Sequence, residues 1–187
     1  MLNLNFTPFP GLLTERLVLR QLQTEDTNEI FALCSNDEVN RFLDRPKATT
    51  IDEAKKFIYK INNGINKNEW VYWAITLKNE TKLIGTICYW NISKENNRAE
   101  VGYELHPHYQ GKGIMHEALL RVIDFGFEQM KLEIIIAVPS GNNIKSRKLL
   151  EQNNFKLDSN LHSMLSQQMN FPNMVVYSVR KNEILTR

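Results

Sequence analysis

The order of hydrophobic and polar residues predicts alternating strands and helices along the chain. Residues 15–22 are typical of a first strand, and residues 24–35 follow with helical spacing. The apolar side of that helix contains Ile30, Phe31, Leu33 and Cys34. A second helix should begin after Thr50, because Thr50 and Glu53 can form a capping box that satisfies free backbone N–H groups near the helix start.

The middle of the chain changes to an alternation of apolar and polar residues, which indicates strands. Residues 69–77 alternate with a period of two, and residues 83–90 and 98–105 follow after short polar turns. Strands joined in this way predict an antiparallel meander. One face of the first strand should be apolar and contain Val71, Trp73, Ile75 and Leu77.

The second half of the chain predicts a helical crossover to a buried strand. Apolar residues recur at helical spacing over residues 115–129, and residues 133–138 form a continuous apolar run. A short helix follows within residues 142–154, with Asn142 or Asn143 as its N-cap.

A last pair of strands, at residues 155–157 and 173–180, completes the predicted order of elements. The meander is antiparallel, whereas the crossover helix should lead to a parallel strand. We therefore expect an α+β fold, with a mixed, mostly antiparallel sheet and helices on both of its faces.

Composition narrows the class of protein. The chain has 187 residues, the length of one domain, and its formal net charge of +2 is too weak for a typical nucleic-acid-binding protein. Its apolar runs are far shorter than the ~18 residues that span a bilayer, and its first residues do not form a signal peptide. We expect a soluble cytoplasmic protein without a nucleic-acid or membrane partner.

The cysteines and histidines do not form a recognisable site. Cys34 and Cys88 are too few for a disulfide framework, and both lie in apolar stretches, so we expect them in the core. His106, His108 and His162 lack the spacing of a metal site. The sequence therefore predicts no metal.

Gly111-Lys112-Gly113 stands where a strand gives way to a helix. A helix start has free N–H groups and partial positive charge, the glycines allow close approach, and the lysine adds charge. The segment thus predicts either a phosphate or pyrophosphate site or simply a tight turn. A Walker A loop does not fit the spacing, and a Rossmann loop would need glycine where His116 stands.

The stretch "LHPHYQGKGIMHEAL" resembles the acetyl-CoA signature of the GNAT acetyltransferase superfamily. The opening "LLTERLVLRQL", the strand "RAEVGYEL" and the segment "NNIKSRKLLEQNNF" resemble the RimJ/RimL-type branch, although Asn154 stands where glycine is usual. The resemblance covers residues 12–181 as one N-acetyltransferase domain. It implies a mixed sheet with a central acetyl-CoA cleft.

The resemblance also implies where acetyl-CoA, the co-substrate, should bind. Main-chain N–H groups of residues 110–115 should hold the pyrophosphate of coenzyme A. The pantetheine arm should lie where residues 99–105 splay from residues 133–138. The expected set is Leu105, Gln110, Gly111, Lys112, Gly113, Ile114, Met115 and Asn143.

Acetyl transfer to an amine needs a neutral amine, a stabilised oxyanion and a proton for the leaving thiolate. Glu100 and Glu104 share one face of a strand, so either is a candidate proton relay, unless both are merely solvated acids. The resemblance gives Ser146 a hydrogen bond to the thiolate. Tyr103 points to the opposite face and is expected in the core.

The expected acceptor is an α-amino group of a protein or peptide N-terminus, as for ribosomal-protein alanine and serine acetyltransferases. Asp158 is the only acid in the loop after Phe155, a departure that weakens the ribosomal interpretation. Two alternatives are an acetyltransferase for a small amine, such as a polyamine, amino acid or drug, and an acyl-CoA-binding module without turnover. Monomer and homodimer are both open.

Overall fold

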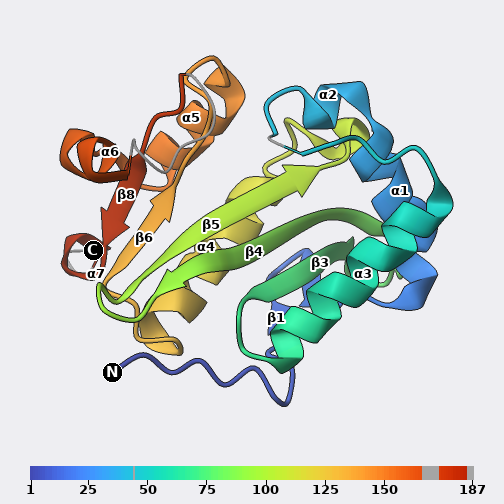
Figure 1. The fold of residues 1–187 in the computed structure, drawn as a ribbon, viewed down its shortest axis with the longest axis horizontal. Coiled ribbons are helices and arrows are strands. Elements are labelled where there is room, and N and C mark those ends of the chain that lie inside the picture. The colour runs from blue at the N-terminus through green and yellow to red at the C-terminus, as the bar shows by residue number, and fades with distance from the viewer. Residues whose placement is uncertain (44, 166–172, 185–187) are drawn as a thin grey trace.

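The computed structural model describes residues 1–43, 45–165 and 173–184. Within them, the strands form one mixed eight-stranded sheet. Its strands are β1 (Leu12–Leu13), β2 (Leu17–Arg20), β3 (Val71–Leu77), β4 (Leu83–Ser93), β5 (Arg98–Leu105), β6 (Ile134–Ala137), β7 (Lys156–Leu157) and β8 (Tyr177–Arg180). They lie in the order β1-β2-β3-β4-β5-β6-β8-β7 (Figure 1). Only β5 and β6 pair in parallel, so the predicted fold class is confirmed.

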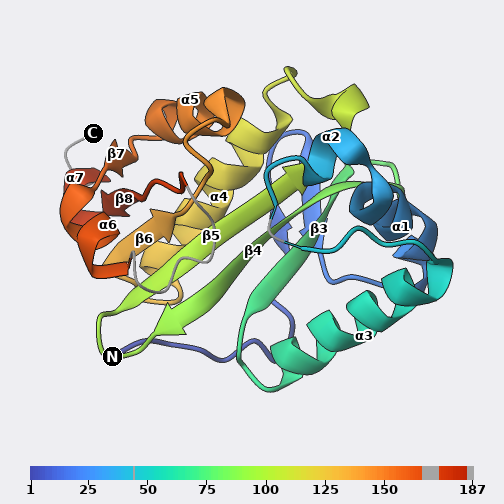
Figure 2. The same ribbon diagram turned by 45° about the horizontal axis from the view of Figure 1, so that its top comes forward.

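Helices cover both faces of this sheet, as predicted. They are η1 (Thr24–Asp26), α1 (Thr27–Ser35), α2 (Asp37–Asn40), α3 (Ile51–Asn66), η2 (Pro107–Tyr109), α4 (Ile114–Glu128), α5 (Ile144–Gln152), α6 (Ser159–Leu165) and α7 (Lys181–Ile184). Helix α4 lies on one face, and α1 and α3 lie on the other (Figures 1 and 2). None of these helices combines the length and apolarity needed to cross a membrane.

Strand β3 is buried on both faces, which corrects the expectation of a single apolar face. Trp73 packs edge-on against Phe125 of α4, with ring centroids 5.3 Å apart. On the other face, Tyr72 packs against Phe57 of α3 at 5.9 Å. The strand lies within a sheet that is covered on both sides, so Tyr72, Ala74 and Thr76, on the face opposite Trp73, are buried as well.

Two predicted helix starts are present in the structure. The Thr50 hydroxyl accepts a hydrogen bond from the N–H of Glu53 at 3.4 Å, and the Glu53 carboxylate accepts from the N–H of Thr50 at 3.3 Å. Asn143 is the N-cap of α5. Asn154 has a φ of +64° after that helix, which explains how asparagine can occupy a position where glycine is usual.

Candidate active site

Among the described strands, the single parallel pairing ends after three residue pairs and leaves a gap. It begins at Arg98–Ile134 and ends at Glu100–Ile136, after which β5 and β6 diverge (Figure 1). The hydrogen bonds from β5 to β4 use alternate residues. The main-chain groups that turn toward the gap are therefore those of Val101, Tyr103 and Leu105. The expected splay between these strands is present.

A cleft of about 1170 Å³ occupies this gap. Its lining includes Glu100, Glu104, Asn143 and Ser146, so the structure brings together four residues of the expected site. The residues that sequence reasoning missed include Arg45, Lys60, Trp70, Tyr72, Trp90 and Arg98. The cleft thus has two glutamates on its β5 wall and aromatic side chains on the wall from β3, β4 and α3.

Glu104 is held in an ion pair inside the cleft. Its side chain is 6% exposed, and its Oε2 accepts from Nη2 of Arg45 at 2.5 Å. The Thr86 hydroxyl donates to Oε1 of Glu104 at 3.2 Å, and Nε of Arg45 donates to Oδ1 of Asn40 at 2.8 Å. Because Glu104 stabilises the half-buried guanidinium of Arg45, taking up a proton there would break this pair.

Glu100 has a different environment on the same face of β5. Its Oε2 accepts one hydrogen bond from the side-chain amide of Asn91 at 3.0 Å. Burial raises the pKa of Glu100 to about 7, against the opposing effects of Asn91 and Arg98. A group with this pKa can both accept and release a proton near neutral pH, so neither glutamate is the simple solvated acid considered above.

Ser146 and Tyr103 form a pair of hydroxyls on the opposite side of the cleft. Their oxygens are 2.8 Å apart, and burial raises the pKa of Tyr103 to about 12. Tyr103 was expected in the core, but it is half-buried and lines the cleft because the splay uncovers this part of β5. Oδ1 of Asn143 accepts from the N–H of Ser146 at 3.1 Å, which fixes the start of α5.

The turn before α4 has the shape of an anion site. Gly111 and Gly113 both have a φ of +73°, and their N–H groups form no hydrogen bond within the described chain. A Cβ atom placed on Gly111 would meet no heavy atom within 4 Å, so the approach to its main chain is open. Arg16 holds the turn, since Nη1 donates to the Lys112 carbonyl at 3.1 Å and Nε to the Glu117 carboxylate at 2.6 Å.

Three members of the expected co-substrate set are already engaged by other groups. The N–H of Gln110 donates to the Pro107 carbonyl at 3.1 Å, so the free N–H groups begin at Gly111 rather than at Gln110. The Gln110 side chain donates to the Leu105 carbonyl at 3.1 Å. The Lys112 ammonium lies 5.6 Å from the centroid of the Tyr109 ring. Ile114 and Met115 bury their side chains and offer only main chain in the first turn of α4.

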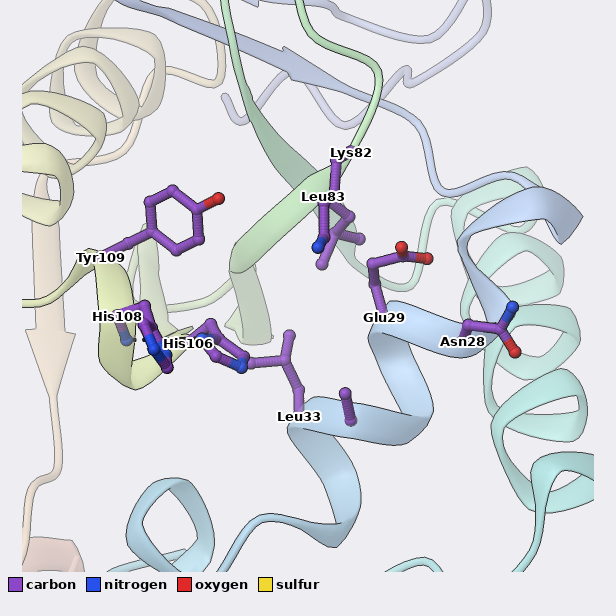
Figure 3. Close-up of a pocket in the computed structure, with 9 residues that line it drawn as sticks. Asn28, Glu29, Leu33, Lys82, Leu83, His106, His108 and Tyr109 are labelled. Atoms are coloured by element: carbon purple, nitrogen blue, oxygen red, sulfur yellow. Dashed lines mark hydrogen bonds between the residues drawn. The ribbon is translucent and has the colours of Figure 1, made fainter.

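A smaller pocket of about 390 Å³ lies between α1, the start of β4 and η2. Figure 3 shows His106 and His108 side by side on η2 and the strand end before it, with Lys82 and Leu83 at the start of β4 and Leu33 on α1. Burial lowers the pKa of His106, as do the neighbouring His108 and Lys82. Within the described ranges, no group of three His, Cys, Asp or Glu side chains is arranged to hold a metal ion.

Asp158, the single acid of the loop after Phe155, has a structural position. It accepts from the Leu161 N–H at 2.9 Å, from the Ser178 hydroxyl at 2.8 Å and from Arg180 at 3.0 Å. Burial would raise the pKa of Asp158, but these bonds outweigh it and hold the pKa below its ordinary value. Asp158 therefore joins α6 to β8 and does not line the cleft.

Comparisons with known proteins agree with this geometry. The chain matches the acetyltransferase (GNAT) domain over residues 16–156. The uncharacterized N-acetyltransferase YoaA of Bacillus subtilis (strain 168) is 32% identical over 173 residues, covering 92% of this chain and 98% of the relative.

Solved structures have the same fold. Ribosomal-protein-S5-alanine acetyltransferase from Vibrio fischeri matches with a TM-score of 0.71 and 26% identity, covering 92% of this chain and 97% of its own. The microcin C7 self-immunity acetyltransferase MccE, solved with acetyl-CoA and AMP, matches with a TM-score of 0.75 and 20% identity, covering 89% and 93%.

The gap between β5 and β6 and the open turn at Gly111 suit an extended thioester arm that is followed by a pyrophosphate. The family match spans most of the chain, and the relative is similar over nearly its whole length. This chain belongs to the GNAT family and is an acetyl-CoA-dependent N-acetyltransferase.

Proposed function

We propose that the acceptor of the acetyl group is an α-amino group, at the N-terminus of a protein or peptide, and that Glu100 is the general base. The observation that carries this proposal is Glu100 in the cleft with a pKa of about 7. An α-amine has a pKa of about 7.7–8.0, whereas lysine has about 10.4. The pKa of Glu100 is therefore close enough to that of an α-amine for Glu100 to accept its proton near neutral pH.

The ion pair of Glu104 with Arg45 supports Glu100 over Glu104 as the base. Glu100 would take the proton that the amine loses, while Glu104 would keep Arg45 and its loop in place. The name of the Vibrio fischeri neighbour, a ribosomal-protein alanine acetyltransferase, supports a RimJ/RimL-like role for this chain.

Acetyl-CoA supplies the activated acetyl group when bound. The main-chain groups at Gly111 and Gly113 would bind its pyrophosphate, and the free main chain of β5 would bind the pantetheine arm, with a β5 N–H near Leu105 polarising the thioester carbonyl. The Ser146 hydroxyl would donate to the departing sulfur, and Tyr103 would in turn donate to Ser146. Asn143 would orient Ser146 through its cap.

This proposal treats residues 12–181 as one N-acetyltransferase domain in a cytoplasmic protein, active as a monomer or homodimer. The two described cysteines are free, which is compatible with a reducing compartment. The second candidate acceptor is a small amine, which the open cleft of about 1170 Å³ would also admit.

Competition between two peptides tests the acceptor. One peptide has a free N-terminus and no lysine, and the other has a blocked N-terminus and one lysine. We expect acetylation of the free N-terminus at pH 7, measured by mass spectrometry with purified enzyme. Faster acetylation of the blocked, lysine-containing peptide would contradict the proposal.

Replacing Ser146 with alanine should lower kcat more than it raises the KM for acetyl-CoA. The lost hydrogen bond to a developing thiolate is worth about 1.5–3 kcal/mol, or roughly 10- to 150-fold in rate. Thiol release measured under conditions where chemistry limits the rate checks this. Ser163→Ala, on α6, is the matched control. An unchanged kcat in Ser146→Ala would remove this residue from the mechanism.

A further inference from the structure

The described lining of the cleft has more cations than its carboxylates can neutralise. Three cationic side chains, Arg45, Lys60 and Arg98, and two carboxylates, Glu100 and Glu104, line it. Arg45 and Glu104 form an ion pair and cancel each other. Glu100, with a pKa of about 7, is only partly ionised at neutral pH. Lys60 and Arg98 therefore leave this part of the cleft positively charged.

Arg98 is the cation that most clearly lacks a partner. Its Nε is buried without a hydrogen bond, and neither Arg98 nor Lys60 forms an ion pair within the part of the chain that the structure describes. Buried donors in native proteins are nearly always satisfied, so the unpaired Nε of a half-buried guanidinium that lines a cleft needs an explanation. An anion bound in the cleft would give this guanidinium the charge partner that no carboxylate of the described chain supplies.

The position of Arg98 relates this anion to the reacting amine. Arg98 and Glu100 are two residues apart on β5, so their side chains share a face at a spacing of ~6.6 Å. Glu100 lies opposite Trp90 on β4, which is 44% exposed and lines the same cleft. A single small acceptor can therefore reach the carboxylate, the guanidinium and the aromatic wall together.

We propose that the acceptor is a primary amine attached to an anionic group, a carboxylate or a phosphate, which Arg98 binds with help from Lys60 while the amine lies at Glu100. This inference rests on the proposed role of Glu100 and narrows the class of acceptor. A polyamine is a poor acceptor under this proposal, because its second ammonium group would be repelled by Arg98. A peptide whose N-terminal residue is followed by an acidic or phosphorylated residue has both the amine and the anionic group that the proposal requires.

Matched peptides test the proposal. They share an N-terminal alanine and an amidated C-terminus, and their second residue is aspartate, asparagine, phosphoserine or serine. We measure kcat/KM for each at low ionic strength, and equilibrium binding by calorimetry in the presence of coenzyme A. We expect a preference of roughly 10- to 100-fold for each charged peptide over its neutral counterpart, and a smaller preference at high salt. The aspartate and phosphoserine arms separate the two sources of negative charge.

Variants assign the preference to its residues. Arg98→Gln should bring the ratio of charged to neutral peptide close to one, and Arg98→Lys should restore part of it. The ratio is the readout because Arg98 also lowers the pKa of Glu100, which affects both peptides alike. Lys60→Gln, at an exposed position, gives a second test if Arg98→Gln does not fold. Lys56→Gln, exposed on α3 outside the cleft lining, should leave the ratio unchanged.

Each outcome has a separate meaning. Equal kcat/KM values for charged and neutral peptides would overturn this inference and leave the α-amine proposal standing. A preference that survives both Arg98→Gln and Lys60→Gln would overturn the assignment to these residues. Preferential binding of charged peptides without any acetylation would support the anion site and contradict the proposed acceptor.

Discussion

Replacing Glu100 with glutamine should lower kcat/KM at pH 7 by about 10²- to 10⁴-fold, the usual range for loss of a general base. Glutamine keeps the shape of the side chain and an oxygen that can accept from Asn91, so the change removes proton uptake and little else. Steady-state thiol release with a peptide acceptor measures the effect. An unchanged kcat/KM would exclude Glu100 as the base.

The pH profile distinguishes a base from a structural residue. In the natural protein, activity should fall as the pH drops through about 7, because Glu100 becomes protonated. The amine itself adds a second limb near its own pKa of about 7.7–8.0. Glu100→Gln should lose the first limb and keep the second. Glu104→Gln is the matched control, and it should keep both limbs because Glu104 is engaged by Arg45.

Stability gives an independent check on Glu100→Gln. Burial raises the pKa of Glu100 in the folded protein above its ordinary value, so the folded state binds more protons than the unfolded state between that value and about 7. The contribution of Glu100 to stability therefore falls as the pH rises through this window. Chemical denaturation at pH 8 should find Glu100→Gln at least as stable as the natural protein, which separates lost activity from unfolding.

Replacing Gly111 with valine should weaken the binding of coenzyme A by about 100-fold. No heavy atom lies within 4 Å of the position that a Cβ would take, so the added side chain would occupy the open approach to the turn. Each charge-assisted hydrogen bond that is lost costs about 1.5–3 kcal/mol, so losing one or two accounts for this change. Isothermal titration with coenzyme A measures it.

Controls separate blocked binding from local strain. Gly111 has a φ of +73°, which a β-branched residue adopts poorly, whereas asparagine tolerates it. Gly111→Asn should therefore stay folded and still bind more weakly. Gly11→Ala, whose Cβ would meet its nearest neighbour at 3.7 Å, should leave affinity unchanged. Undiminished affinity in a folded Gly111→Val protein would contradict the placement of the pyrophosphate.

Sequence periodicity predicted the long elements because each buries an apolar face. Helix α4 and the meander of β3, β4 and β5 follow this rule. The short elements β1, α2, α6 and α7 were not foreseen, since two to seven residues carry too little periodicity to distinguish them from loops. Their positions depend on tertiary contacts such as the bonds that Asp158 makes with Ser178 and Arg180.

The parts of the candidate site that lie within one short segment could be predicted from the sequence. The parts that form where segments distant in the sequence meet could not. Gly111 and Gly113 stand out in the sequence because a turn needs their backbone conformations. Arg45 and Glu104 are 59 positions apart, and no local pattern indicates that they form an ion pair. Tyr103 was assigned to the core because alternation along a strand shows which face a residue takes and does not show where that face is left uncovered.

The early end of the parallel pairing also makes the stability of this fold depend on its co-substrate. Beyond Glu100, main-chain groups of Val101 and Tyr103 face the gap without a strand partner, and a bound thioester arm would act there as a temporary extra strand. A ligand that binds only the folded chain stabilises it by about 2.7 kcal/mol at 100 times its Kd. Amides on this edge should therefore exchange with solvent more slowly when acetyl-CoA is bound than when the cleft is empty.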